Sequence, residues 1–191
     1  FDWRLALESI DNGADKIRLN PGNIFKKEQI KEIVKAAKLK HIPIRVGLNS
    51  GSLRSSQCSS VHGSQCVADR MVKSALDYIK ILEGFKFYDI VVSLKASDIL
   101  DTMEAYRSMS RVCNYPMHLG LTATGLPFKG AVKSSIVIGS LLSEGIGDTI
   151  RVSLTDNPEE EIKVARAILE ALKVRHFGPQ IISCPTCGRC E

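Results

Sequence analysis

The stretch DKIRLNPGNIFKKEQIKEIVKAAKLKHIPIRVGL, residues 15–48, decides the fold, because it holds a strand, a helix and a second strand in immediate succession. Its two ends, residues 15–20 and 43–48, are short apolar runs with few interruptions, which is typical of strands in a buried parallel sheet. The middle part, residues 26–40, repeats apolar residues at the spacing of one helix face. This stretch therefore predicts two parallel strands joined by a right-handed crossover.

The same alternation continues along the chain in both directions. Further strands are expected at residues 88–95, 116–122, 148–154 and 179–184. Further helices are expected at residues 3–12, 68–84, 99–113, 131–144 and 159–174. Strands that alternate with helices in this way predict an α/β fold built on parallel strands.

Two architectures fit that pattern, a doubly wound open sheet and a (βα)8 barrel. Most of the predicted strands carry polar residues toward their carboxyl ends, and a barrel gathers all these ends on one rim. An open sheet binds its ligand only where the strand order reverses, and neither G-x-G-x-x-G nor a P-loop motif is present. We therefore predict a partial (βα)8 TIM-type barrel of about six βα units. Because the chain begins in mid-helix without Met and ends within a cysteine motif, we expect it to be truncated at both ends.

Composition narrows the class of protein further. The 191 residues are 44% hydrophobic and 25% charged, which is ordinary for a globular domain. No apolar run of about 18 residues and no signal peptide occurs, so we expect no membrane span and a cytosolic location. The net charge of +5 is spread along the helices, which favours solvated helix faces over nucleic-acid binding.

Cations recur inside the apolar strands, at Arg18, Arg45, Lys95 and Arg151. A cation in a strand is costly unless it is paired, and for any one of them a salt bridge to a carboxylate is an adequate explanation. Four cations at equivalent positions favour a shared anion instead, since guanidinium groups match phosphate oxygens. Neutral hydrogen bonds to the same anion are expected from Asn20, Asn49, Ser97 and Ser153.

His118 and the C-terminal cysteines are the other candidates for chemistry. His118 lies within a predicted strand, where it is either a core residue or a proton carrier at the rim. Cys184 and Cys187 form a Cys-x-x-Cys pair, which serves zinc, redox or iron–sulfur sites. Cys190 extends the pair, and this spacing favours a cluster over zinc.

Several of these segments together resemble a known enzyme family. They are DKIRLNPGN from residue 15, PIRVGLNSGS from residue 43, VSLKASD from residue 92, PMHLGLT from residue 116, KSS from residue 133, SEGIGDTIRVSLT from residue 143 and ISCPTCGR from residue 182. In this order they are similar to the HMBPP synthase family, also called IspG or GcpE, of the methylerythritol phosphate route to isoprenoids.

The resemblance implies a reductive ring opening and dehydration of 2-C-methyl-D-erythritol 2,4-cyclodiphosphate to 4-hydroxy-3-methylbut-2-enyl diphosphate. It implies a [4Fe–4S] cluster, reduced ferredoxin or flavodoxin as electron donor, and a homodimer in the full-length enzyme. Residues 1–183 would form the substrate-binding barrel domain, and residues 184–191 would begin the cluster domain. The resemblance also suggests a bacterial cytoplasmic enzyme, and a plastid one remains an alternative.

The resemblance assigns roles residue by residue. Cys184 and Cys187 match two cluster ligands, with the other ligands beyond Glu191. The diphosphate-binding positions match Arg18, Asn20, Arg45, Asn49, Lys95, Arg151 and Ser153. Ala123 stands where the family has a glutamate that acts as an acid, and loss of such an acid costs about 10²–10⁴-fold in rate. The alternatives are therefore a catalytically impaired diphosphate-binding relative and a zinc-ribbon structural or nucleic-acid-binding protein.

Overall fold

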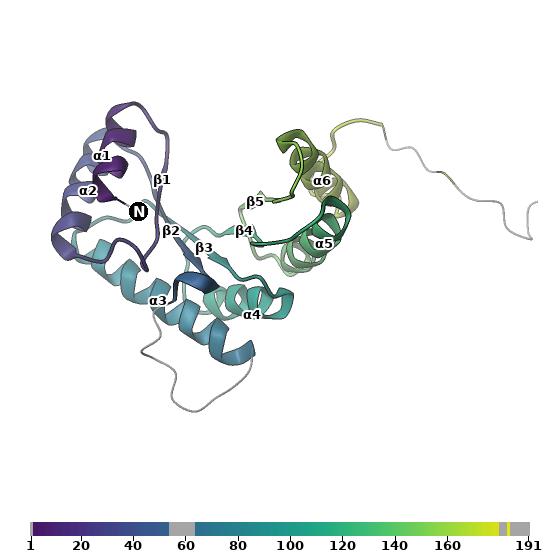
Figure 1. Cartoon of the computed structure of the whole chain (residues 1–191), viewed down its shortest axis with the longest axis horizontal. Helices are drawn as coiled ribbons and strands as arrows, with labels where there is room; N and C mark the ends of the chain where they lie inside the picture. Colours follow the sequence, from purple (N-terminus) through teal and green to yellow (C-terminus); the bar gives the residue numbers. More distant parts are fainter. Residues whose placement is uncertain (1, 54–63, 180–182, 184–191) are drawn as a thin grey trace, which may run out of the picture.

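Strands and helices alternate along the whole of the described chain (Figure 1). The computed structural model describes residues 2–53, 64–179 and 183. The strands are β1 (Ile17–Leu19), β2 (Ile44–Asn49), β3 (Ile90–Lys95), β4 (His118–Gly120) and β5 (Thr149–Arg151). The helices are α1 (Trp3–Asp11), α2 (Lys27–Lys40), α3 (Ser64–Gly84), α4 (Ile99–Ser110), α5 (Pro127–Ser143) and α6 (Pro158–Ala171), with the short 3-10 helix η1 (Ser50–Ser52) after β2.

All strand pairs are parallel and follow the order of the sequence. The strands β1, β2 and β3 form one sheet, and β4 and β5 form a second. A single parallel bridge between Val92 and Met117 connects β3 to β4, and the Val92 amide donates to the Pro116 carbonyl at 2.8 Å. The order β1 to β5 is that of consecutive βα units, and the described strands do not close into a ring.

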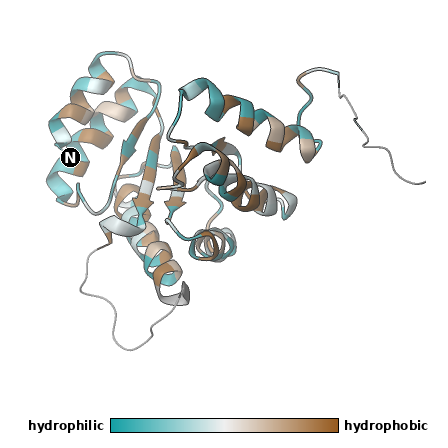
Figure 2. Cartoon of the chain, turned by 45° about the vertical axis from the view of Figure 1, so that its right-hand side comes forward, coloured by the Kyte–Doolittle hydropathy of each residue, from teal (hydrophilic) through white to brown (hydrophobic). Residues whose placement is uncertain are grey.

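The two faces of the strands differ sharply in polarity. One face carries apolar side chains that are buried or partly buried, among them Ile44, Val46 and Leu48 of β2. These side chains form one hydrophobic core with the inner faces of the helices, which follow one another around the strands (Figures 1 and 2). The opposite face, called the polar face below, carries the alternate residues, because side chains along a strand alternate between faces.

Local sequence signals account for the helix ends near the site. Asp98 caps the start of α4, where its side chain accepts hydrogen bonds from the amides of Leu100 and Asp101 at 2.8 and 3.0 Å. Pro127 and Pro158 occupy the first turns of α5 and α6, where proline is tolerated because those amides have no helical partner. These caps fix where the chain turns from each strand into the next helix.

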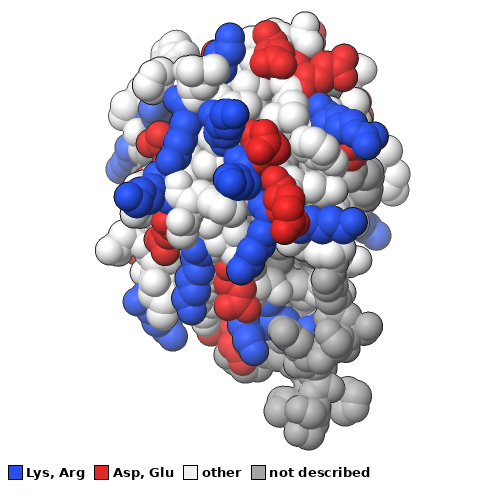
Figure 3. Space-filling model, turned by 90° about the vertical axis from the view of Figure 1, so that its left-hand side faces the viewer, with Lys and Arg blue, Asp and Glu red and all other residues white. Residues whose placement is uncertain are grey.

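The surface on the α1 and α2 side carries charged side chains of both signs, as is usual for a globular protein (Figure 3). On the side where α1 and α2 lie, lysine and arginine side chains are interspersed with aspartate and glutamate (Figure 3). Within the described residues, no helix has the length and apolar character needed to cross a bilayer.

The structure corrects some of the predicted boundaries. The strands expected at residues 15–20 and 116–122 are shorter than predicted, because only their central residues pair with a neighbour. Helix α3 begins at Ser64, before the predicted residue 68. Of the strand predicted at residues 179–184, Pro179 and Ser183 are not in a strand, and the remaining residues lie outside the described part of the chain.

Candidate functional site

Strand register places the predicted cations on one face. Arg18 of β1 pairs with Arg45 of β2, and Asn49 at the end of β2 pairs with Lys95 of β3. Paired residues of parallel strands share a face, and so do residues an even number of positions apart. The Val92–Met117 bridge puts Gly120 on the face of Lys95, and Gly120 pairs with Arg151 of β5. Side chains from four strands therefore meet on the polar face, and we call Arg18, Arg45, Lys95 and Arg151 the cation cluster.

None of the four is neutralised by an acidic residue in the described part of the chain. The ion pairs found there join other residues, namely Arg4 with Asp2, Arg107 with Glu144 and Lys163 with Glu160. The carboxylate of Asp98, which follows the Lys95 strand, is used in capping α4. The salt-bridge explanation of these strand cations therefore fails for the described residues.

The two arginines of the first sheet differ in their hydrogen bonds. Arg18 Nη2 donates to the Gly47 carbonyl at 2.9 Å and to Asn49 Oδ1 at 3.3 Å. Arg45 has a buried Nε that no described residue accepts from. Burial lowers the pKa of both arginines, and the positive charge of Arg151 lowers it further. A buried, unpartnered guanidinium N–H is an unmet donor, which an anionic ligand would satisfy.

The pKa of Lys95 shows most clearly how the cations of the cluster affect one another. Burial, and then the charges of Arg151, Arg45 and Arg18, lower its pKa to about 8, while Glu161 of α6 acts weakly in the opposite direction. The carboxylate of Glu161 accepts a hydrogen bond from the Leu154 amide at 2.9 Å, so it is engaged elsewhere. The cluster is thus a region of unrelieved positive potential.

His118 lies beside the cluster on the same face. It is 8% exposed, its Nδ1 is 2.8 Å from Thr149 Oγ1, and its buried Nε2 has no partner among the described residues. Burial, followed by the charges of Arg45, Lys95, Lys16 and Arg151, lowers the pKa of His118 to about 3. The imidazole is therefore neutral at physiological pH. In the tautomer in which Nδ1 accepts from the Thr149 hydroxyl, Nε2 can donate one hydrogen bond without adding charge.

The uncharged residues that were predicted to bind the anion lie at the carboxyl ends of the same strands. Only one of their side chains makes a hydrogen bond to a cation of the cluster. Asn20 Oδ1 accepts from the Gly22 amide at 3.0 Å and from Ser52 Oγ at 3.3 Å, which closes a turn after β1. The carbonyl of Ser153 accepts a hydrogen bond from Thr124 Oγ1. Ser97 is exposed in the turn between β3 and α4. Asn49 alone contacts a cation directly.

Ala123 follows β4 at this same end of the strands. Its side chain is exposed, and its backbone is left-handed, with φ of 54°. This conformation costs a non-glycine residue roughly 1–2 kcal/mol. The neighbouring Thr124 is 4% exposed, and its hydroxyl donates to the carbonyl of Ser153, so the segment that carries Ala123 is held to the chain that follows β5.

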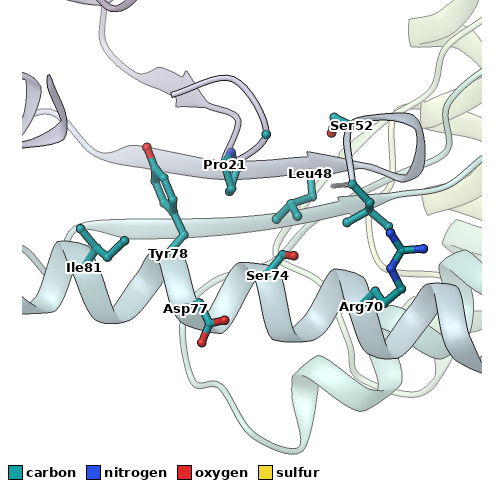
Figure 4. A pocket seen from close by; sticks show the side chains of 10 residues that line it. Pro21, Leu48, Ser52, Arg70, Ser74, Asp77, Tyr78 and Ile81 are labelled. Carbon is teal, nitrogen blue, oxygen red and sulfur yellow. The ribbon is translucent and has the colours of Figure 1, made fainter. Parts of the chain in front are cut away.

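One cavity lies on the helix side of the sheet, away from the polar face. It has a volume of about 310 Å³ and is bounded by α3 on one side and by the segments that follow β1 and β2 on the other (Figure 4). Leu48 and Ile81 give it apolar walls, while Ser74 and Tyr78 add hydroxyl groups. None of the four cations of the cluster lines this cavity.

Two residues that the sequence did not single out hold His118 in place. Thr149 faces its Nδ1, and Tyr106 of α4 donates to the His118 carbonyl at 2.6 Å while accepting from the Leu94 amide at 3.0 Å. Tyr106 is fully buried and so joins β3 to β4 beneath the polar face. The sequence did contain a signal for Tyr106, namely a tyrosine near the centre of a predicted helix. When such a tyrosine is buried, its hydroxyl must find a hydrogen-bond partner.

The predicted metal ligands Cys184 and Cys187 lie outside the described residues, as does Cys190. Within residues 2–53 and 64–179, no cluster of three or more histidine, cysteine, aspartate or glutamate side chains could hold a metal ion.

Parallel strands in sequential order, with cations from four of them on the face opposite the helices, define an α/β protein with a cluster of positive charge at its strands. The sequence matches the GcpE TIM-barrel domain family over residues 1–166, and the chain belongs to this family.

Named relatives agree with that assignment. The chain is 56% identical over 191 residues to the 4-hydroxy-3-methylbut-2-en-1-yl diphosphate synthase (flavodoxin) of Fusobacterium nucleatum, covering all of this chain and 53% of that protein. It is 53% and 52% identical over its full length to enzymes of the same name from Listeria monocytogenes and Clostridium perfringens, of which it covers 51% and 54%. The chain thus spans about half the length of the curated relatives it matches.

Proposed function

We propose that this chain holds the diphosphate of 2-C-methyl-D-erythritol 2,4-cyclodiphosphate, as part of a longer enzyme that converts it to 4-hydroxy-3-methylbut-2-enyl diphosphate. The observation that carries the proposal is the cation cluster, in which four cations from four strands share one face with no acidic partner among the described residues. The names of the relatives supply the product, 4-hydroxy-3-methylbut-2-en-1-yl diphosphate, and the resemblance stated above supplies the substrate.

The reaction fits a site of this kind. Two electrons and one proton are consumed. The bond from a ring carbon to a phosphate oxygen breaks to leave that oxygen as an anion, a carbon–hydroxyl bond breaks and the hydroxyl leaves with the proton as water, and a carbon–carbon double bond forms. The phosphate oxygen gains negative charge as the ring opens. Positive charges that are already in place near that oxygen stabilise its new charge without having to rearrange. Stabilisation of this kind is usually the largest single contribution to catalysis.

Each residue then has a physical role in binding. Arg45 and Arg151 offer guanidinium groups to phosphate oxygens, Lys95 adds a point charge, and Arg18 reaches the site along β2. A bound dianion removes the mutual repulsion of the cluster, so part of the binding energy is relief of that repulsion. His118 adds a neutral hydrogen bond through Nε2.

We further propose that the described strands are part of a TIM-type barrel, completed by βα units outside them. The sequential order of β1 to β5 and the family match support this. The full-length enzyme is expected to be a homodimer in the bacterial cytoplasm.

The donor set at the C-terminus suits a cofactor of the iron–sulfur class. Cys184 and Cys187 are thiolates two residues apart within a Cys-Pro-Thr-Cys sequence, and such pairs commonly bind [4Fe–4S] clusters. We propose them as cluster ligands, with the others supplied by the rest of the enzyme. The cluster would supply the electrons. Flavodoxin is the expected donor because the names of the relatives include it, and ferredoxin is the alternative.

The proposal is tested by binding of the cyclodiphosphate to the complete protein. Arg45→Ala and Arg151→Ala should each weaken binding by roughly tenfold to a hundredfold, because each removes a charged hydrogen bond to the ligand. The matched control is Lys163→Ala, which removes an exposed lysine that pairs with Glu160 on α6. Calorimetric titration measures the dissociation constants. Unchanged binding in either arginine variant, with the fold intact by circular dichroism, would place the anion elsewhere.

Colour and turnover separate the remaining alternatives. The complete protein purified without oxygen should be brown and should turn over the cyclodiphosphate with reduced flavodoxin. A colourless zinc-containing product would indicate the zinc-ribbon alternative. Tight binding and a brown protein without turnover would indicate a catalytically impaired relative.

A further inference from the structure

Glycine occurs twice within the strands of the described residues, at Gly47 in β2 and at Gly120 in β4. Both lie on the polar face, since Gly47 is two residues from Arg45 and Gly120 pairs with Arg151. Neither has a positive φ, so neither backbone requires glycine. Glycine within a strand is unfavourable by roughly 0.5–1 kcal/mol relative to alanine and often marks a close approach by another group. At both positions that group is a cation of the cluster.

The side chain of Arg18 lies directly over Gly47. A Cβ atom added at Gly47 would collide with Arg18 Nε and would lie 3.0 Å from Arg18 Cδ and Cγ. The same arginine donates from Nη2 to the Gly47 carbonyl at 2.9 Å and to Asn49 Oδ1 at 3.3 Å. Arg18 therefore crosses from β1 onto β2 and lies flat along it, toward the carboxyl end.

Lys95 makes the equivalent crossing on the next pair of strands. A Cβ atom at Gly120 would lie 2.8 Å from Lys95 Nζ, 3.0 Å from Lys95 Cε and 2.8 Å from the Arg151 carbonyl oxygen. The ammonium group of β3 is thus held over β4, next to the backbone of β5. Two cations that start on different strands both lean across the following strand, and each does so over a glycine.

We propose that Gly47 and Gly120 are positioning residues of the anion site, which let Arg18 and Lys95 lie flat across the neighbouring strands so that one ligand reaches all four cations. The proposal rests on the proposed function in taking the ligand to be a diphosphate. A methyl group at either position would lift the cation away from the sheet toward solvent. The bound anion would then contact fewer positive charges. At Gly47 the strand backbone would not have to move, because the added methyl group meets only the Arg18 side chain.

Gly47→Ala gives the cleanest test, because all three nearest atoms to the added methyl belong to the flexible side chain of Arg18. In the complete protein, Gly47→Ala should weaken the binding of inorganic pyrophosphate at pH 7 about tenfold, the value of one charged hydrogen bond. In an Arg18→Ala background, the same change should have no further effect, because the displaced group is absent. Gly139→Ala is the control, since a Cβ at Gly139 of α5 meets no atom within 4 Å.

The outcomes separate this proposal from the proposed function. Wild-type affinity in Gly47→Ala, or an equal loss in the Arg18→Ala background, would overturn the positioning role. The second readout needs no ligand. Gly120→Ala should raise the pKa of Lys95 from about 8 toward that of a free lysine, as followed by NMR of the Lys95 side chain, because the ammonium moves into water. If the pKa of Lys95 is unchanged in Gly120→Ala, the positioning role of Gly120 is overturned. If the wild-type protein binds no diphosphate, only the proposed function is overturned.

Discussion

Raising the pH from 7 to 9.5 should release the cyclodiphosphate, because Lys95 loses its proton in the free protein well below the range of an ordinary lysine. Burial and three arginine charges lower its pKa to about 8. A bound diphosphate supplies negative charge and should return that pKa to about 10.4, the unperturbed value. The ligand therefore binds most tightly when Lys95 is charged, and it takes up a proton when it binds at alkaline pH.

The size of the effect follows from the two pKa values. At pH 7 Lys95 is about 90% protonated in the free protein and fully protonated in the complex. At pH 9.5 it is roughly 3% protonated when free and about 90% when bound. The ratio of these fractions gives an affinity about 25-fold lower at pH 9.5 than at pH 7. At pH 9 binding should take up roughly 0.9 proton. The substrate contributes little itself, since each ring phosphate has one acidic group that is ionised well below pH 7.

Calorimetric titration in buffers of different ionisation enthalpy measures both quantities. Lys95→Met is the matched control, which should bind more weakly at pH 7 and lose less than about threefold in affinity by pH 9.5. If the wild-type protein and Lys95→Met show the same dependence on pH, or if no proton is taken up, Lys95 does not face the ligand as a depressed cation.

Three further predictions concern the residues around the cluster. The His118 ring should not titrate between pH 5 and pH 9 in the free protein, because its pKa is lowered to about 3, and NMR of the ring carbons would reveal any titration in that range. Tyr106→Phe should destabilise the fold by roughly 1–3 kcal/mol, because it leaves the His118 carbonyl and the Leu94 amide buried without this partner; a thermal midpoint equal to that of the wild type would refute this. Ala123→Glu should raise turnover in the complete enzyme by up to about 10²-fold if an acid belongs there, and Ala123→Gln should not; equal rates for the two variants would exclude an acid role at this position.

The cations could be found from the sequence because the physical rule behind them is local. A charged side chain in an apolar run is expensive, so Arg18, Arg45, Lys95 and Arg151 stand out wherever the strands lie. Alternation along each strand then fixes the face, and a parallel sheet brings the faces together. The strand register places all four on that face.

Other parts of the site depend on distances between strands that the sequence does not contain. Whether Arg18 leans over Gly47 is set by the register of β1 on β2 and by the rotamer of the arginine. The pairing of His118 with Thr149 likewise requires the register of β4 on β5. The ends of β4 were overestimated because apolar residues, Met117 and Leu121, lie on both sides of the residues in the strand.

The structure of the complete protein bound to 2-C-methyl-D-erythritol 2,4-cyclodiphosphate tests the central claim most directly. The account predicts phosphate oxygens within about 3 Å of the side-chain nitrogens of Arg45, Lys95 and Arg151, with Arg18 still lying along β2. A diphosphate held away from the polar face, or cations of the cluster paired with carboxylates from the rest of the protein, would contradict it.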